Sequence, residues 1–412
     1  MWKRAVSQTV WAKRGLGVRS ALVVGLLALS ACASSVGLDV AATTATLTPV
    51  APSSTASPTT TLRPISGESI AIGLLFADTT KTRPLVVAPN SVDGLEAAVN
   101  IPGGGIGGRP LLLVACEAKN DAALKGCAKT FSEKRAYGVV VANDDTFSLK
   151  ALEKLAKDFP VVVANPSRIS TLTSRSLLAA TAGIPGLAQG MAIAARRELK
   201  AETVAVVHFG DAESNALYKS VVRAVSVKLG AKPTNITEVI LEAGGSAKEV
   251  ARAFSVVKSV ASVVVSLVWG TACNQLHSWT AEQELVPEVI AFESCVRQLS
   301  PSKSQGWFEA HYGDNSSSDA VRRAVTTMIN VLAARPVRGL SAPTFGSLMN
   351  STSRDMGPFQ ETPLCGEVAV YPALCSSKMG VARLVDGTRD DVRGGSGAAA
   401  IDLFADLDVA GS

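Results

Sequence analysis

The chain from Ser69 onward repeats one pattern of hydrophobic and polar positions: a short apolar run, a turn, and then a longer amphipathic segment. Continuous apolar runs predict strands that are buried on both faces of a sheet, and the amphipathic segments predict helices. The expected strands of this unit are Ile70–Phe76, Leu111–Ala115, Tyr137–Ala142 and Pro160–Ala164, and the expected helices are Ser91–Asn100, Asn120–Lys134 and Phe147–Lys157.

The same rhythm starts again after the fourth of these strands and predicts a second unit. Ser246 and Glu249 have the spacing of a capping box, which predicts that a helix begins just after Ser246. Regular alternation of strand and helix is typical of parallel sheets, so the predicted fold class is α/β with two doubly wound lobes. The expected helices here are Gly186–Leu199 and Glu213–Leu229, and the expected strands are Thr203–Phe209, Ile236–Leu241, Val260–Val268 and Glu288–Phe292.

A glycine-rich turn leads into the second expected strand. The segment Pro102–Glu117 has five glycines between positions 103 and 108, and glycine enters the positive-φ region without a Cβ penalty. Gly103, Gly105 and Gly108 also match G-x-G-x-x-G, but a dinucleotide site needs a strand before the glycines and a helix after them. Because the order is reversed here, we favour a tight turn over a cofactor site.

This turn and its flanks resemble the entry signature of the type I periplasmic binding proteins of the Leu/Ile/Val-binding family. The resemblance extends more weakly from about Ser69 to about Gly387. It implies two lobes joined by a multi-strand hinge, with a ligand cleft between them. The matching residues are Gly94, Ala97, Ala98, Asn100, Gly104, Gly105, Ile106, Gly108, Arg109, Pro110 and Glu117.

The resemblance also implies how the lobes divide the chain. Gly306–Tyr312 is expected to return to the first lobe and to lead into a helix at Ala320–Ala333. A long helix that the family usually carries before that point is shortened here to Asp314–Asp319. The expected parts are a signal peptide at 1–31, an anchor and tether at 32–67, a first lobe at 68–183 with 306–350, a second lobe at 184–305 with 351–390, and a C-terminal tail at 391–412.

The N-terminal residues predict export and a lipid anchor. Met1–Arg19 contains five basic residues and no acid, and the apolar run Ala21–Leu29 is too short to cross a bilayer. The sequence Leu-Ser-Ala-Cys that ends at Cys32 matches the lipobox of bacterial lipoproteins. An ordinary signal with a chance cysteine is the alternative, but position, small residues and apolar run together favour lipidation. We expect the protein on the outer face of the bacterial cytoplasmic membrane, held there by Cys32.

The net charge and the amino-acid composition both change after the expected signal peptide. Five of the 40 basic residues and none of the 35 acids precede Cys32, which leaves 35 of each. A neutral chain gives no electrostatic reason to expect a nucleic-acid partner. Ala33–Pro64 consists mainly of Ala, Thr, Ser and Pro, which cannot bury enough surface to offset the entropy of ordering. This segment is predicted to be a disordered tether.

Six cysteines remain after Cys32, an even number in a chain that is expected to be exported. Six cysteines allow fifteen connectivities, and the short separations favour pairing in sequence order. A zinc site is the rival interpretation, but the chain has no C-x-x-C and no nearby histidine cluster. The expected disulfides are Cys116–Cys127, Cys273–Cys295 and Cys365–Cys375.

Sequence templates for catalysis are missing from the chain. Its three histidines are far apart, and His208 lies in an expected strand, where a packed residue is the favoured interpretation. The chain has no G-x-S-x-G and no H-E-x-x-H, so the common nucleophile and metal templates do not apply. We expect a protein that is not an enzyme and that holds no metal or cofactor.

The expected ligand residues follow the carboxyl ends of the strands, where doubly wound sheets bind ligands. The resemblance implies that Thr146 and Ser167 offer hydroxyls to a ligand carboxylate, although Ile169 could take the second position. It implies that Glu293 pairs with a ligand ammonium and that Trp269 packs against the ligand. Glu213 stands where the family usually has a tyrosine. For each residue, a solvent-facing loop role is the alternative.

The first functional hypothesis is a lipid-anchored solute-binding protein that delivers a small polar ligand, an amino acid or an amide, to an ABC permease. The second is an envelope lipoprotein that uses the same fold for sensing or for binding a protein partner. The sequence Asp144-Asp145-Thr146-Phe147 replaces the Ser-Ser-Gly that the family carries at this place, which favours the second hypothesis.

Overall fold

The computed structural model describes residues 65–77, 92–101, 104–229, 236–242, 247–255, 262–282, 287–312, 316–352, 363–376, 378–386, 388–391 and 401–402. The chain divides into a unit Met1–Thr59 and a unit Thr60–Ser412, and all described residues belong to the second. The expected signal peptide, the Cys32 lipidation site and most of the tether and tail lie outside the described residues. Within the described ranges, no helix is long and apolar enough to cross a membrane.

The first lobe is built on a five-stranded sheet. Its strands are β1 (Ile70–Ala77), β2 (Leu111–Ala118), β3 (Val139–Asn143), β4 (Val161–Asn165) and β5 (Leu178–Ala179). They lie in the order β2-β1-β3-β4-β5, and every neighbouring pair is parallel. All residues of β1, β3 and β4 are buried, because helices cover both faces of the sheet. This is the doubly wound arrangement that the alternation of apolar and amphipathic segments predicts.

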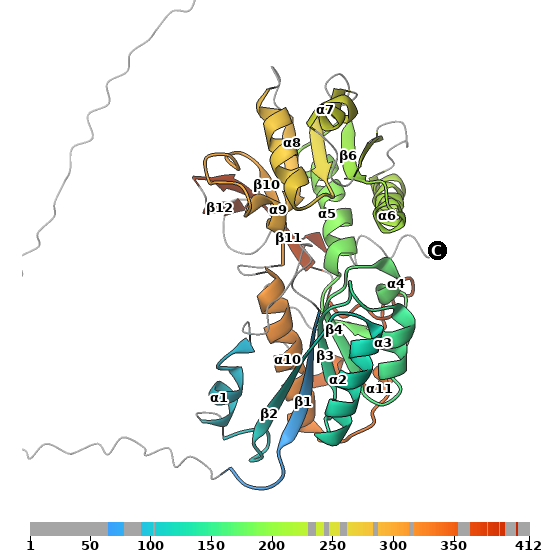
Figure 1. Ribbon diagram of the computed structural model, residues 1–412, viewed down its shortest axis with the longest axis vertical. Helices are drawn as coiled ribbons and strands as arrows, with labels where there is room; N and C mark the ends of the chain where they lie inside the picture. Colours follow the sequence, from blue (N-terminus) through green and yellow to red (C-terminus); the bar gives the residue numbers. More distant parts are fainter. Residues whose placement is uncertain are drawn as a thin grey trace, which may run out of the picture. The chain divides into compact units, whose positions relative to one another are not determined.

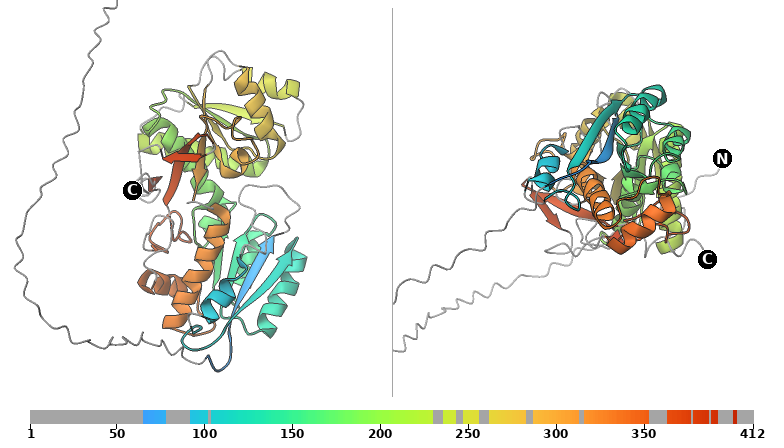
Figure 2. Two further views of the ribbon diagram at one scale, coloured as in Figure 1. Left: turned by 90° about the vertical axis from the view of Figure 1, so that its left-hand side faces the viewer. Right: turned by 90° about the horizontal axis from the view of Figure 1, so that it is seen from below.

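Helices cover both faces of this sheet (Figures 1 and 2). Leu124 and Phe131 of α2 and Leu152 of α3 pack against one face of the sheet, while Ala324 of α10 and Phe345 of α11 pack against the other. The bounds are α1 (Leu95–Asn100), α2 (Asp121–Glu133), α3 (Leu149–Leu155), α4 (Ile169–Leu172), α10 (Ser316–Ala334) and α11 (Ala342–Thr352).

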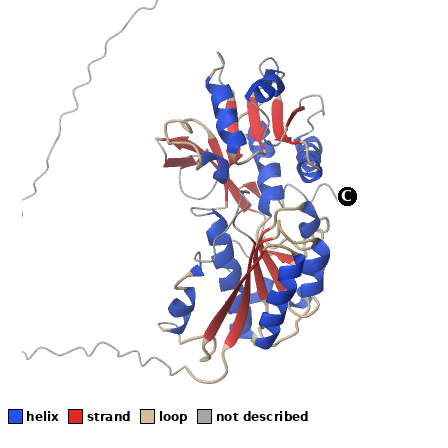
Figure 3. Cartoon of the chain, in the orientation of Figure 1, coloured by secondary structure: helices blue, strands red, loops and turns tan. Residues whose placement is uncertain are grey.

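The second lobe is built on a second sheet, whose strands are red in Figure 3. Its strands are β6 (Val204–Phe209), β7 (Ile236–Leu241), β8 (Val263–Ser266), β9 (Glu288–Phe292), β10 (Phe308–His311), β11 (Lys378–Val385), β12 (Thr388–Asp391) and β13 (Ile401–Asp402). The order is β12-β11-β10-β9-β8-β6-β7, and β13 pairs with β11. The strands from β6 to β10 are parallel, whereas β11 and β12 are antiparallel to their neighbours.

Helices cover both faces of this sheet as well. Leu187 of α5 and Val221 of α6 pack with one set of strand residues, and Leu276 of α8 packs with the alternate set. The bounds are α5 (Gly183–Arg197), α6 (Ala212–Leu229), α7 (Ala247–Ser255), α8 (Thr271–Ala281) and α9 (Glu293–Val296). The parallel part of each sheet thus repeats one strand order, in which the second strand of the lobe lies outside the first.

The glycine-rich turn is held by two specific contacts. The Asn100 side chain accepts a hydrogen bond from Leu111 N at 2.7 Å and donates one to Leu111 O at 2.9 Å, which ties α1 to β2. Gly105 has a φ of 73°, and a Cβ there would lie 2.1 Å from the Arg109 carbonyl oxygen. Glycine is therefore required where the chain doubles back before β2.

Two segments lie on the other side of the expected lobe boundaries. Residues 308–311, which the resemblance assigns to a return into the first lobe, form β10 beside β9 in the second sheet. Residues 363–376, assigned to the second lobe, include Ala373, whose carbonyl accepts a hydrogen bond from Ala179 of β5 at 2.7 Å. A single helix, α10, covers the described part of the region where a shortened segment and a separate helix are expected.

Three disulfides join cysteines in the described part of the chain, and they are the three pairs that the spacing predicts. Cys116–Cys127 joins β2 to α2, and Cys273–Cys295 joins α8 to α9. Cys365–Cys375 closes a loop beside β5. Each bond therefore ties neighbouring segments within one lobe.

Candidate functional site

A cavity of about 330 Å³ lies where loops of the two lobes meet. Ser167 and Arg168 come from the loop after β4, the residues from Ala212 to Leu217 begin α6 after β6, and Trp269 follows β8. All three segments leave the carboxyl ends of parallel strands, which is where doubly wound sheets bind ligands. The described lining residues are Ser167, Arg168, Ile169, Ser170, Ile184, Ala212, Glu213, Ser214, Ala216, Leu217 and Trp269.

The cavity is largely apolar. Ile169, Ile184, Leu217 and Trp269 supply large hydrophobic side chains, and serines supply most of the neutral polar groups. Trp269 packs edge-on against Phe209 with a centroid distance of 5.0 Å, which orients the indole. An apolar cavity of this size with a few polar groups is typical of small-molecule sites.

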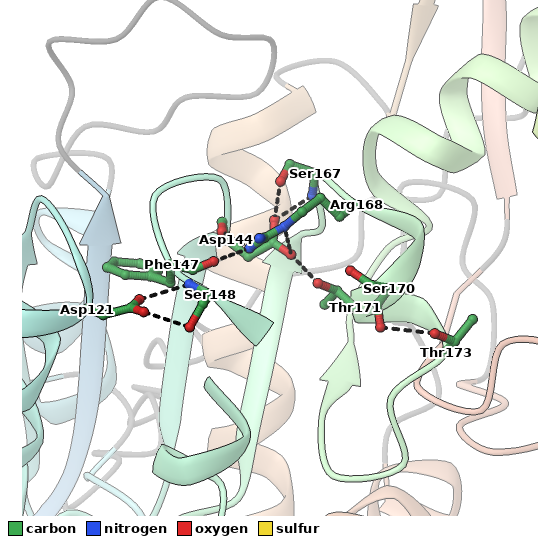
Figure 4. Close-up of polar contacts among 9 residues, drawn as sticks. All are labelled: Asp121, Asp144, Phe147, Ser148, Ser167, Arg168, Ser170, Thr171 and Thr173. Carbon is green, nitrogen blue, oxygen red and sulfur yellow. Dashed lines mark hydrogen bonds and ion pairs between the residues drawn. The ribbon is translucent and has the colours of Figure 1, made fainter. Parts of the chain in front are cut away.

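Asp144 organises the first-lobe side of the cavity (Figure 4). Its side chain is fully buried, and its Oδ1 accepts hydrogen bonds from Ser167 N at 2.6 Å and from Ser167 Oγ at 2.5 Å. Its Oδ2 accepts a hydrogen bond from the Thr171 hydroxyl. Because a carboxylate is an acceptor with two oxygens, Asp144 holds the loop after β4 and the start of α4 together.

Arg168 reinforces this junction. Its Nη2 donates to the carbonyl oxygens of Asp144 and Phe147, and its Nε lies 3.8 Å from Asp144 Oδ2. Next to it, the Asp121 carboxylate accepts hydrogen bonds from Ser148 N at 2.8 Å and from Ser148 Oγ at 2.6 Å (Figure 4). The Ser148 hydrogen bond lowers the pKa of Asp121 below its ordinary value. The loops after β3 and β4 therefore form one connected polar unit.

The second-lobe side is set by the start of α6. Asp211 precedes this helix and accepts hydrogen bonds from Ser214 N at 2.9 Å and Ser214 Oγ at 2.7 Å. A side chain that accepts from the first-turn amides is a helix cap, and it fixes where α6 begins. Glu213 lies in that first turn and lines the cavity.

Three of the five expected ligand residues come together at this cavity: Ser167, Glu213 and Trp269. Thr146 and Glu293 are not among its described lining residues. The Thr146 hydroxyl oxygen is buried, and it has no hydrogen-bond partner in the described part of the chain. The Ser167 hydroxyl, for which the resemblance implies a ligand carboxylate as partner, donates its proton to Asp144 here.

Glu293 belongs to a separate buried cluster in the second lobe. Its carboxylate pairs with Arg297 and lies 3.3 Å from Nη2 of Arg389, which also pairs with Glu309. Glu293 is only 5 % exposed and Glu309 only 3 %. Burial raises the pKa of Glu293 to about 7, helped by the charge of Glu309 and opposed by the two arginines.

His208 is packed inside the second lobe, as the sequence interpretation favours. One ring nitrogen lies 2.7 Å from the Phe209 carbonyl oxygen and the other 3.0 Å from Glu238 Oε1. The ring stacks on Tyr218 with a centroid distance of 4.9 Å. Within the described residues, no group of three or more His, Cys, Asp or Glu side chains is placed to hold a metal ion.

Several residues of this site are not among the expected ligand residues. From the sequence, Asp144 is only part of the segment that replaces the family's Ser-Ser-Gly, and Arg168 and Ile184 are not expected at the site. Asp144 directly follows the last residue of β3, and Arg168 comes three residues after β4. Their positions after strand ends were a usable signal, but nothing in the sequence showed that Asp144 would accept the donors of Ser167.

No protein-family model and no curated protein matches the chain. Many solved structures resemble it in fold. A branched-chain amino acid ABC transporter periplasmic ligand-binding protein from Burkholderia xenovorans LB400 is 14 % identical, with a TM-score of 0.63. That match covers 84 % of this chain and 97 % of the other.

Two further matches were solved with ligands. An ABC transporter substrate-binding protein from Desulfitobacterium hafniense in complex with Leu is 14 % identical, with a TM-score of 0.60, and the match covers 79 % and 100 % of the two chains. A solute-binding protein from R. palustris in complex with benzoate is 12 % identical, with a TM-score of 0.60 and coverage of 81 % and 97 %. The expected resemblance is confirmed at the level of structure: the chain has the fold of the type I periplasmic binding proteins.

Proposed function

We propose that the protein is an extracytoplasmic solute-binding protein that binds a small organic ligand and delivers it to an ABC transporter. The cavity that Trp269, Glu213 and the Ser167 loop line is the observation that carries this proposal. It lies at the carboxyl ends of strands from both sheets, where closure of two lobes about a hinge would enclose a ligand.

The ligand class follows from the lining. Four large apolar side chains suit a hydrocarbon or aromatic body, and the serines with Glu213 suit a polar end. Proteins with this fold have been solved with Leu and with benzoate, which have such a body and such an end. No bond is made or broken in this function.

The anchoring belongs to the same proposal. The lipobox that ends at Cys32 would hold the protein on the outer face of the cytoplasmic membrane, close to a permease. The low-complexity segment Ala33–Pro64 would act as a tether that lets the folded part extend away from the membrane surface.

Binding can be measured directly on the purified protein by thermal shift and by Trp fluorescence, with a library of amino acids, amides and aromatic acids. A ligand at 100 times its Kd should stabilise the protein by about 2.7 kcal/mol. Trp269→Ala should weaken that ligand about tenfold or more, because it removes the largest apolar wall of the cavity. Glu288→Gln, an exposed change in β9, is the control and should leave affinity unchanged. If no compound in the library binds, a sensing or partner-binding role would be favoured.

A further inference from the structure

Asp144 accepts three hydrogen bonds from the segment that follows β4 (Figure 4). Ser167 gives both its backbone N–H and its hydroxyl proton to Asp144 Oδ1, and Thr171 gives its hydroxyl proton to Oδ2. A serine hydroxyl has one proton and two lone pairs. What Ser167 can still offer to a ligand in the cavity is therefore its lone pairs, so it acts there as an acceptor.

The charges point the same way. Arg168 and Glu213 are the ionisable side chains among the described lining residues. Arg168 is paired with Asp144 and donates to two backbone carbonyls, so its positive charge is balanced inside the protein. Glu213 adds a negative charge on the opposite side.

We propose that the ligand meets the first-lobe loop with an N–H group, as an amide or an amine does, and not with a free carboxylate. This inference rests on the proposed function and specifies its ligand. Asp144 is a positioning residue: it does not line the cavity, and it acts by orienting the Ser167 hydroxyl. A carboxylate at this place would face the lone pairs of the Ser167 hydroxyl oxygen, whereas an N–H group finds an acceptor there.

Matched ligands test the proposal on the full-length protein. Leucine, leucinamide and 3-methylbutylamine share one apolar body, and benzoate, benzamide and benzylamine share another. Kd values come from titration calorimetry. We expect the amide or the amine of at least one set to bind at least tenfold more tightly than its carboxylate.

Two outcomes would overturn the inference, and they differ from each other. Carboxylates that bind as tightly as their amides and amines would leave the proposed function standing and remove the inference. Absence of binding by all six compounds and by the wider library would remove the proposed function, and the inference with it.

Two variants test the route through Asp144. Asp144→Asn removes the charge and supplies an amide donor, which frees the Ser167 proton to turn toward the cavity. The ratio of carboxylate Kd to amide Kd should then fall at least tenfold. Ser167→Ala removes the acceptor and should weaken the amide at least threefold without weakening the carboxylate.

Asp158→Asn, an exposed acid after α3, is the matched control and should leave the ratio unchanged. A purely structural role for Asp144 would weaken all ligands equally and leave the ratio as it was, which would contradict the proposal. If Asp144→Asn does not fold, an unchanged ratio in Ser167→Ala has the same meaning.

Discussion

Single residues in this protein have roles that depend on their contacts more than on their type. Asp144 and Glu293 are both buried acids that follow a strand, yet Asp144 accepts several neutral donors beside one arginine and Glu293 lies between two arginines. Glu309 shares Arg389 with Glu293, so two acids compete for one cation. Burial disfavours the charged form of a carboxyl group, and this is why the pKa of Glu293 rises to about 7.

The raised pKa of Glu293 predicts a pH dependence of stability. The folded protein binds a proton at Glu293 up to about pH 7, whereas the unfolded chain releases it near the ordinary pKa of 4.5. The contribution of Glu293 to the free energy of unfolding should therefore fall as pH rises from 4.5 to 7, and stay level above that. The shift corresponds to about 3 kcal/mol at most.

Urea unfolding between pH 4.5 and 8 checks this prediction. In Glu293→Gln the falling contribution should disappear, so the difference in unfolding free energy between variant and parent should change across that window. Glu133→Gln removes an exposed acid that pairs with Lys129, and it should show no such change. A parallel pH profile for parent and Glu293→Gln would contradict the prediction.

Helices in this protein differ in how closely neighbouring elements pack against them, and the space around two helical glycines shows this difference. A Cβ at Gly190 of α5 would lie 1.9 Å from the sulfur of Met379 in β11, which is fully buried. A Cβ at Gly126 of α2 would meet nothing within 4 Å. Both residues are in helices, so helix propensity favours alanine over glycine at both positions.

Alanine at these two glycines should have opposite effects. Gly126→Ala should stabilise the protein by about 0.5–1 kcal/mol, because glycine loses more freedom in a helix than alanine does. Gly190→Ala should destabilise it by about 1–3 kcal/mol, because the added methyl group overpacks α5 against β11. Thermal unfolding of the two variants measures both signs. A stabilising effect of Gly190→Ala would mean that α5 and β11 are not packed as closely as described.

At the scale of the whole molecule, the covalent cross-links are disulfides between nearby segments, and a lipid on Cys32 is expected to attach the chain to the membrane. Each disulfide joins neighbouring segments within one lobe, so ligand-driven movement between lobes is left free. Within the second lobe, Tyr312 after β10 is held to the start of α5, because its hydroxyl donates to the Gly183 carbonyl oxygen at 2.8 Å. The tether and Cys32 would then be the route by which this unit stays at the membrane.

Cys32 is predicted to be the membrane attachment of the protein. Cys32→Ser should abolish labelling by a palmitate analogue and should release the protein or leave it unprocessed, because the serine cannot receive the thioether-linked lipid. Fractionation and mass spectrometry of the N-terminal peptide measure both effects. Cys365→Ser, which removes a cysteine near β5, is the control for lipid labelling. A Cys32→Ser protein that remained lipidated and membrane-bound would refute the assignment.

The sequence by itself determined the elements and the class of fold. Apolar runs such as Tyr137–Ala142 become strands because only a sheet covered on both faces buries every residue of the run, and that condition is local. Pairing of nearby cysteines such as Cys116 and Cys127 is also short-range, since the chain between them restricts their partners. Strand ends likewise indicated where Ser167, Glu213 and Trp269 would gather.

Only the tertiary structure decided the lobe to which β10 belongs and the partners of Asp144 and Glu293. The sequence Phe-Glu-Ala-His of Phe308–His311 does not specify either sheet, and pairing with β9 and β11 places it in the second. Ser167 lies 23 residues from Asp144, and Arg389 lies 96 residues from Glu293. Such contacts form only when the whole chain packs. The local sequence pattern therefore predicts neither the direction of a hydrogen bond nor the sharing of one arginine by two acids.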